Sequence, residues 1–271
     1  MEKNAVLVVS FGTSHLDTLN SCIEATENRI HEALPGFELR RAFTSNFIIK
    51  KLAKRDKVII DKPQKALERL KNEGFTHVVV QPLHILPGYE YHKIKDVVME
   101  FTRRRTFKSL LLGEPLLYNN KDYPVVVEAL KTQLTLRDDE TACILMGHGT
   151  DHFSNACYYC LQSFIDESGL NAYIANVEGA PSLENVLGKL KRKETKKIKL
   201  MPFMLVAGDH ARNDMAGEED SWKTILEKEG FEVEVHMHGL GEKEEFRQIF
   251  AQKALETSSN GKKLIRPMQK I

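Results

Sequence analysis

Two short motifs recur in the same order in the two halves of this 271-residue chain, and this duplication restricts the folds open to it. The segment Val8–His15 aligns with Leu145–His152, and further along Val80–Leu83 aligns with Leu200–Phe203. The identical pairs are Gly12 and Gly149, Thr13 and Thr150, His15 and His152, Pro82 and Pro202, and Gly88 and Gly208. Such a repeat predicts two structurally similar halves.

Short apolar runs alternate with longer amphipathic segments along both halves. Strands are expected at Ala5–Val9, Phe37–Phe43, His77–Pro82, Lys108–Leu112, Ala142–Met146, Ala172–Val177, Lys197–Pro202 and Glu232–His238. Helices are expected at Asp17–Glu32, Asn46–Lys54, Pro63–Glu73, Tyr91–Arg104, Tyr123–Leu134, Ser154–Asp166, Ser182–Lys191, Glu218–Glu229 and Glu242–Thr257. Strands that alternate with helices predict parallel sheets covered on both faces. We therefore expect an α/β protein of two Rossmann-like halves.

The boundary between the halves is expected at a polar stretch, Arg137–Glu140. The N-terminal half then spans residues 1–136 and the C-terminal half residues 137–257, while residues 258–271 form a polar, basic tail. In open parallel sheets, ligands bind beyond the carboxyl ends of the strands. Both repeated motifs follow predicted strands, so a ligand site is expected in a central cleft that the two sheets face.

Composition and charge argue against several classes of partner. Lys and Arg number 39 against 38 Asp and Glu, and the net charge of +1 gives no broad attraction for nucleic acid or an anionic membrane. The N-terminal residues lack the features of a signal peptide, and no stretch approaches 18 uninterrupted apolar residues. We expect a cytoplasmic protein that binds neither nucleic acid nor membrane. The oligomeric state stays open, with a homo-oligomer among the alternatives.

Two histidines at strand ends are the leading candidates for chemistry. His148 lies between two glycines directly after a predicted strand, and these glycines leave its imidazole open to a ligand. His210 follows a strand and a Gly-containing loop, and either Asp209 or Asp214 could orient its ring. The alternative for His210 is a plain polar helix start.

Carboxylates and a third imidazole occupy related positions. In the repeat, Glu90 stands where His210 stands, and His92 lies two residues further on. Glu178 ends a predicted strand with a glycine behind it. Imidazole and carboxylate together suit a borderline divalent cation such as Co²⁺, Ni²⁺ or Fe²⁺, and they also suit proton acceptance. The alternative for Glu90 is a solvated residue favoured by the helix dipole.

The first glycine loop, Ser10–Thr13, argues against nucleotide binding. It contains glycine and hydroxyl groups but neither GxGxxG nor GxxxxGK[ST], so no phosphate-binding signature is present in it. By the repeat, Phe11 stands where His148 stands, and His84 stands where Met204 stands. A Met in the sister position indicates that His84 is structural or lines the substrate.

The combination of these motifs resembles the anaerobic sirohydrochlorin cobaltochelatases, which are ATP-independent class II chelatases. The resemblance runs from about residue 3 to 257 and rests on Val9–Thr13, Leu83–Ile85 with Gly88 and Glu90, Met146–Gly149, Val177–Gly179 and Pro202–His210. It implies Co²⁺ insertion into the tetrapyrrole sirohydrochlorin during cobalamin biosynthesis. His148, His210 and Glu178 are then implied as metal contacts, with His92 as a further candidate and Glu90 as a catalytic carboxylate.

The same resemblance implies a substrate-binding set on the first half. Its members are Ser10, Phe11, Gly12, Thr13, His84 and Gly88. Phe11 could pack on the flat macrocycle, and the alternative for it is a core position. Three other functions stay open on the sequence: a related chelatase for iron or nickel, a protein that only holds a metal or tetrapyrrole, and a nucleotide-dependent α/β enzyme. The missing phosphate-binding signature counts against the last.

Overall fold

The computed structural model describes residues 2–134 and 140–259, and it consists of two compact units. The first unit contains the chain up to Leu116 together with the C-terminal segment that starts at Arg247, and the second contains Leu117–Phe246. The sequence had placed the boundary at residues 136 and 137 and the last helix in the second half. The predicted link falls largely on residues 135–139, and the predicted tail on residues 260–271, both outside the described residues.

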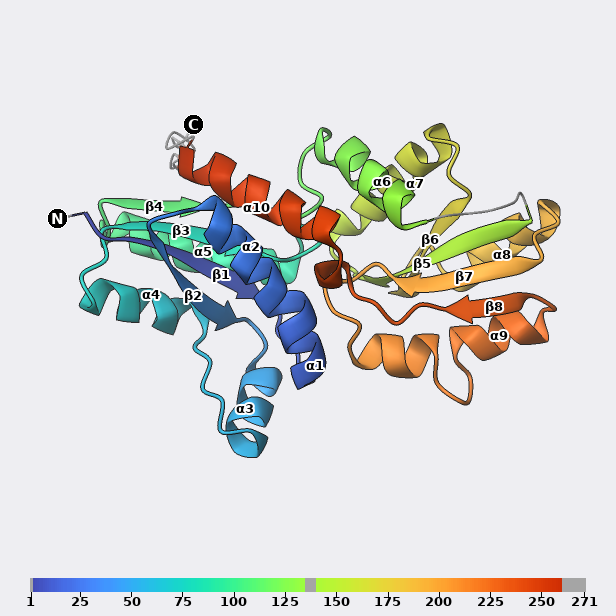
Figure 1. Cartoon of the computed structure of the whole chain (residues 1–271), viewed down its shortest axis with the longest axis horizontal. Coiled ribbons are helices and arrows are strands. Elements are labelled where there is room, and N and C mark those ends of the chain that lie inside the picture. The colour runs from blue at the N-terminus through green and yellow to red at the C-terminus, as the bar shows by residue number, and fades with distance from the viewer. Residues whose placement is uncertain (1, 135–139, 260–271) are drawn as a thin grey trace. The chain divides into compact units, whose positions relative to one another are not determined.

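The first unit is built on a four-stranded parallel sheet with the order β2-β1-β3-β4 (Figure 1). Its elements are β1 (Asn4–Ser10), α1 (Leu16–Thr18), η1 (Leu19–Glu24), α2 (Ala25–Ala33), β2 (Phe37–Phe43), α3 (Asn46–Arg55), α4 (Pro63–Asn72), β3 (His77–Pro82), α5 (Tyr89–Arg103), β4 (Ser109–Leu112) and most of α10 (Glu244–Ser259). One face of the sheet packs on α4 and α5, with Val80, Leu67 and Ile94 in that core.

The second unit repeats this topology with the order β6-β5-β7-β8. Its elements are α6 (Asp122–Gln133), β5 (Thr141–Gly149), η2 (Phe153–Asn155), α7 (Ala156–Glu167), β6 (Ala172–Glu178), α8 (Leu183–Arg192), β7 (Lys197–Pro202), η3 (Ala211–Met215), α9 (Trp222–Lys228), β8 (Glu232–Val235) and η4 (Leu240–Glu242). The α/β fold class with two similar parallel sheets is therefore confirmed.

The C-terminal helix returns to the first unit because its apolar side chains complete that unit's core. Phe250 and Ala254 are fully buried on α10. Arg247 of this helix donates to the Ser21 carbonyl oxygen at 3.3 Å, and Arg29 donates to Gln248. Figure 1 shows α10 in red beside α2 in blue. No helix among the described residues is both long and apolar enough to span a bilayer.

Three predicted elements differ from the structure by three or more residues at one end. β5 continues to Gly149 instead of Met146, because the glycines after Met146 allow the pairing with β6 to extend to Glu178. β8 ends at Val235, so His236 and His238 follow the strand. α9 begins at Trp222, where the hydroxyl group of Ser221 accepts a hydrogen bond from the Thr224 amide and caps the helix.

Candidate functional site

The two motif loops that follow β1 and β5 have the same hydrogen bonds. The amide of His15 donates to the Thr13 hydroxyl at 3.2 Å, and the amide of His152 donates to the Thr150 hydroxyl at 3.1 Å. The Thr–x–His motif therefore forms the same turn in each unit. The repeat recognised in the sequence is a repeat of local geometry.

His148 lies at the carboxyl end of β5, where its neighbours must be small. Gly149 has a φ of +79°, and a Cβ atom there would overlap the carbonyl oxygen of Glu178. A Cβ at Gly147 would overlap the Asn176 side chain and press on Tyr158. The tight contact between β5 and β6 thus requires both glycines, while the His148 side chain remains 47 % exposed. The His148 imidazole is therefore accessible to a ligand at the end of a tightly packed strand.

The ring nitrogens of His148 have distinct roles. Nδ1 lies 3.0 Å from the carbonyl oxygen of Gly149. A carbonyl oxygen can only accept, so in this hydrogen bond Nδ1 carries the proton and donates. In the neutral ring, Nε2 then keeps its lone pair for a metal ion or a proton.

The Nδ1 atom of His210 also has a hydrogen-bond partner, which is a carboxylate instead of a backbone carbonyl. His210 lies after β7, at the start of the π-helical turn η3, and its Nδ1 is 2.6 Å from Oδ2 of Asp214. A carboxylate accepts from Nδ1–H, which orients the ring and leaves Nε2 as the nitrogen with a lone pair. Of the two aspartates that the sequence offered as orienting partners, Asp214 makes this contact. Its spacing of four residues from His210 is the signal that places both side chains on one face of a helical turn.

The two imidazoles lie against each other in the second unit. The ring centroids of His148 and His210 are 4.6 Å apart, and the planes meet at 84°. Two imidazoles that bind one ion at 90° to each other, as in octahedral coordination, with metal–nitrogen bonds of about 2.1 Å, have centroids about 4.5 Å apart. The spacing of this histidine pair is therefore suited to a shared metal ion.

Glu178 joins the pair from the end of β6. Its Oε2 lies 4.0 Å from Nδ1 of His148, and its side chain is 63 % exposed. At this distance the carboxylate is near the pair without being bonded to it. Among the residues that the structure describes, no three His, Cys, Asp or Glu side chains lie close enough to enclose a metal ion.

Two asparagines that the sequence reading did not single out hold the Glu178 loop in place. Asn155 accepts a hydrogen bond from the Thr150 amide at 3.2 Å and donates to the carbonyl oxygen of Ala180. Asn176 donates to the same Ala180 oxygen at 3.1 Å. These bonds connect the loop after β5 with the loop after β6. Their signal in the sequence is slight, because Asn is also common in loops that bind nothing.

In the first unit, the position equivalent to His210 is occupied by Glu90. The amide of His92 donates to the Gly88 carbonyl at 3.0 Å, as the amide of Arg212 does to the Gly208 carbonyl, also at 3.0 Å. Each glycine thus begins one helical turn. Glu90 and His210, each two residues after its glycine, occupy the same position in that turn. Nδ1 of His92 also donates to the Gly88 carbonyl oxygen, at 3.1 Å, which fixes the ring as in His148.

Glu90 lies in the first turn of α5. Burial raises the pKa of this carboxyl group, but Lys93, through its hydrogen bond and its charge, together with the nearby Thr44 hydroxyl, more than offsets burial, so the pKa is lower than usual. Its Oε2 is buried and has no hydrogen-bond partner among the described residues. Glu90 is therefore an ionised carboxylate with one oxygen unused.

His84 lies four residues before Gly88, and both of its ring nitrogens are buried without a hydrogen-bond partner in the described chain. Burial lowers its pKa to about 4, although the nearby negative charge of Glu90 raises it in part. His84 is therefore neutral at pH 7. Its environment matches that of the partly buried Met204, which packs on the core of the second unit at the equivalent position.

The first glycine loop contains one exposed and three enclosed residues. Phe11 is 52 % exposed, whereas Ser10 and Thr13 are buried. Gly12 has a φ of +97°, and a Cβ atom there would overlap the ring of Phe43. The Thr13 hydroxyl lies 3.1 Å from that of Thr18. Phe11 is thus the side chain of this loop that is free to contact a ligand.

The structure therefore brings together His148, His210 and Glu178, with Asp214 behind them, in the second unit. The remaining predicted residues, namely Glu90, His92, His84, Gly88 and Ser10–Thr13, belong to the first unit. Within each unit they lie at the carboxyl ends of the parallel strands, where ligands of such sheets bind. The cleft between the halves stays a prediction.

Comparison with known proteins agrees with this arrangement. Residues 4–259 match the family model described as cobalt chelatase (CbiK). A sirohydrochlorin cobaltochelatase of Salmonella typhimurium is 41 % identical over 250 residues, which cover 92 % of this chain and 94 % of that protein. The sirohydrochlorin cobaltochelatase CbiKC of Nitratidesulfovibrio vulgaris is 33 % identical over 252 residues, covering 92 % and 89 % of the two chains.

A solved structure with the same fold is SirB from Bacillus subtilis with Fe³⁺. Its TM-score is 0.64 at 15 % identity, and the alignment covers 96 % of this chain and 97 % of that one. At this identity the likeness concerns the fold. Taken with the family match over almost the whole described chain, it leads to one assignment: the chain belongs to the cobalt chelatase (CbiK) family.

Proposed function

We propose that this chain is a sirohydrochlorin cobaltochelatase, an enzyme that inserts Co²⁺ into sirohydrochlorin during cobalamin biosynthesis without using a nucleotide. Two relatives that align over nine-tenths of this chain carry the name sirohydrochlorin cobaltochelatase. The observation in the structure that best supports the proposal is the pair formed by His148 and His210. Both rings are oriented through Nδ1 and have Nε2 to offer.

In this proposal the histidine pair receives the substrate ion and removes part of its water shell. A divalent cobalt ion exchanges two water ligands for the Nε2 atoms of His148 and His210, which suit it as borderline ligands. Glu178 supplies a third contact or balances the charge of the ion. An open set of two or three protein ligands leaves coordination positions for the nitrogens of the tetrapyrrole. The ion can then pass from the protein to the ring.

Insertion also releases two pyrrole protons, and carboxylates are the groups proposed to accept them. Glu90 is ionised and has one oxygen without a partner among the described residues, so it is the catalytic carboxylate that we propose on the first unit. His92, whose Nδ1 donates to the Gly88 carbonyl oxygen, is a further metal contact or proton acceptor in the proposal. Phe11 provides an exposed aromatic face for the flat substrate.

The direct test is a metal-insertion assay with purified protein, sirohydrochlorin and Co²⁺, followed by the absorption change of the tetrapyrrole. Replacement of His148 or His210 by Ala should lower the initial rate by about 100-fold or more, because each removes a contact to the ion. His238→Ala is the matched control. Nδ1 of His238 is 2.8 Å from Oε2 of Glu242, so this exposed imidazole also has a carboxylate partner four residues on. Wild-type rates in both active-site variants would contradict the proposal.

The same assay separates the competing functions. Fe²⁺ and Ni²⁺ tested beside Co²⁺ show whether the chain is a chelatase for another metal, and protoporphyrin tested beside sirohydrochlorin identifies the ring. Tight binding of metal or tetrapyrrole without turnover would indicate a protein that only holds its ligand. An added nucleotide should leave the rate unchanged. A cytoplasmic location, a possible homo-oligomer and the absence of nucleic-acid or membrane partners stay predictions from the sequence.

A further inference from the structure

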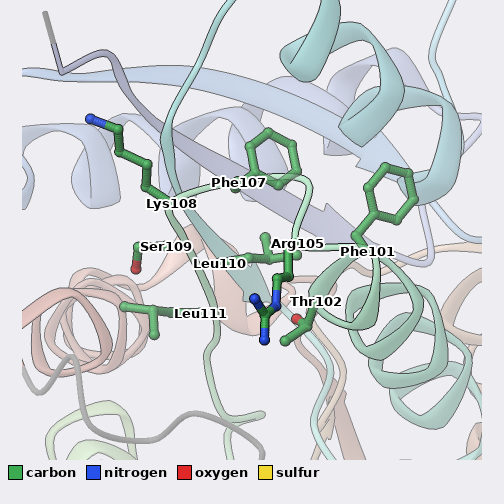
Figure 2. A pocket seen from close by; sticks show the side chains of 8 residues that line it. All are labelled: Phe101, Thr102, Arg105, Phe107, Lys108, Ser109, Leu110 and Leu111. Atoms are coloured by element: carbon green, nitrogen blue, oxygen red, sulfur yellow. The ribbon is translucent and has the colours of Figure 1, made fainter.

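The first unit contains a cavity of about 410 Å³ at the amino end of its sheet, between the end of α5 and the start of β4. Figure 2 shows the side chains that surround it, which are Phe101, Thr102, Arg105, Phe107, Lys108, Ser109, Leu110 and Leu111. The predicted substrate residues of this unit lie after β1 and β3, at the carboxyl ends of the strands. The cavity is therefore a separate feature of the unit.

The turn between α5 and β4, whose residues line the cavity, is longer than three similar turns. In four helix-to-strand turns of this protein, an amide donates back to a carbonyl oxygen five residues earlier; the donors are Phe75, Thr106, Thr195 and Phe231. Phe75, Thr195 and Phe231 are buried and fill the space under their turns. Two residues separate Thr106 from β4, compared with one or none in the other three turns, and the aromatic side chain comes at Phe107, where it stacks on Phe101 with ring centroids 6.3 Å apart.

Arg105 occupies the left-handed position of this turn, with a φ of +49°. The equivalent positions of two other turns hold Gly74 and Gly230, and the fourth holds Glu194. Left-handed backbone is unfavourable for a residue with a Cβ, so glycine is the ordinary choice. In Figure 2 the Arg105 guanidinium is directed toward Thr102. Arginine at this place puts a cation beside the cavity at a cost in backbone energy.

The charge beside the cavity is not neutralised by any residue that the structure describes. Within the described chain, the side chains of Arg105 and Lys108 have no hydrogen bond or ion pair, and the neighbouring Glu100 pairs with Arg104 instead. The floor of the cavity includes the buried apolar side chains of Phe101, Leu110 and Leu111. Two free cations above an apolar floor are complementary to a ligand with an anionic group on an apolar body.

We propose that this cavity binds a small organic anion, a carboxylate or phosphate monoester on an aromatic or short aliphatic body. The volume equals that of about 14 water molecules, which suits a ligand of about 10–15 non-hydrogen atoms and is too small for a tetrapyrrole. The Arg105 guanidinium binds the anionic group with two parallel hydrogen bonds, and Lys108 adds longer-range attraction. The apolar body of the ligand contacts Phe101, Leu110 and Leu111.

The test is calorimetric titration of the full chain with phenyl phosphate, with phenylacetate and with the neutral benzyl alcohol. For ligands of this size we expect dissociation constants of about 1 mM for the two anions. Arg105→Gly should weaken both anions at least about tenfold and should fold normally, because Gly74 and Gly230 occupy the same turn position. Glu194→Gly, which makes the same backbone change in the second unit, should leave binding unchanged.

Each other outcome has a defined meaning. Phenyl phosphate bound more tightly than phenylacetate identifies the natural ligand as a phosphate ester, and the reverse order identifies a carboxylate. Equal binding of benzyl alcohol and the anions would overturn the proposal, since the cations would then have no role. Binding that persists unchanged in Arg105→Gly, or no binding of either anion to the wild-type chain, would overturn it as well.

Discussion

Replacing His84 by Met should remove a large part of the acid sensitivity of this protein. Burial lowers the pKa of this imidazole to about 4, compared with 6.5 for the exposed side chain. Because the unfolded chain binds the proton more readily, the folded state is favoured above pH 6.5 and loses this advantage as the pH falls toward 4. Met is the matched replacement, since Met204 occupies the equivalent position of the second unit.

The size of the effect follows from the two pKa values. Between pH 7.5 and pH 5 the unfolded imidazole becomes almost fully protonated, while the folded one stays almost neutral. The difference corresponds to about 2 kcal/mol of folding free energy lost by the wild-type protein over this interval. His84→Met has no group that titrates here. Between pH 7.5 and pH 5, the variant should therefore lose about 2 kcal/mol less folding free energy than the wild-type protein.

Urea unfolding at pH 7.5 and pH 5, followed by circular dichroism, measures this difference in both proteins. The comparison uses the change in stability between the two pH values. A packing difference caused by Met is the same at both values and therefore cancels. The single tryptophan, Trp222, lies in the second unit, and its fluorescence gives a separate signal for that unit. If both proteins lose the same stability between the two pH values, the buried neutral imidazole is not the source of the acid sensitivity.

Three further substitutions test the second unit. Asp214→Asn should weaken Co²⁺ binding by about 10–100-fold in calorimetry, because an amide can donate to Nδ1 of His210 and favour the wrong tautomer; unchanged affinity would show that the carboxylate does not orient the ring. Gly149→Ala should lower the free energy of unfolding by about 3 kcal/mol or more, compared with about 1–2 kcal/mol for Gly36→Ala, whose Cβ meets no atom within 4 Å; equal melting temperatures would refute the overlap with β6. Glu178→Gln should slow Co²⁺ insertion by about 100-fold if the carboxylate contacts the ion or accepts a proton, and wild-type rates and metal affinity together would exclude both roles.

Much of the fold was predictable because the sequence repeats its own pattern. Strand β3 at His77–Pro82 and strand β7 at Lys197–Pro202 have the predicted bounds, since β-branched and apolar runs there end at a proline. The positions of His148 and His210 after their strands also follow from this local pattern. In a parallel sheet all carboxyl ends lie on one edge, so the order of strands alone predicts that loops after different strands approach each other.

Other features depend on contacts between residues far apart in the chain. The sequence offered Asp209 and Asp214 equally as partners of His210, and the π-helical turn η3 is what selects Asp214. It ended β5 at Met146, but pairing with β6 extends the strand past His148. Local preferences do not contain this information, because each outcome is decided by which other strand or turn lies within reach.

The amino-acid sequence by itself therefore determined the order of helices and strands, the internal duplication and the residue types that carry the chemistry. These depend on spacing along the chain, and spacing is readable without coordinates. The tertiary structure decided that α10 packs with the first unit, that the rings of His148 and His210 lie 4.6 Å apart, and that a cavity lies beside the turn that contains Arg105. These depend on packing in three dimensions, where the lowest free energy is set by many distant side chains together.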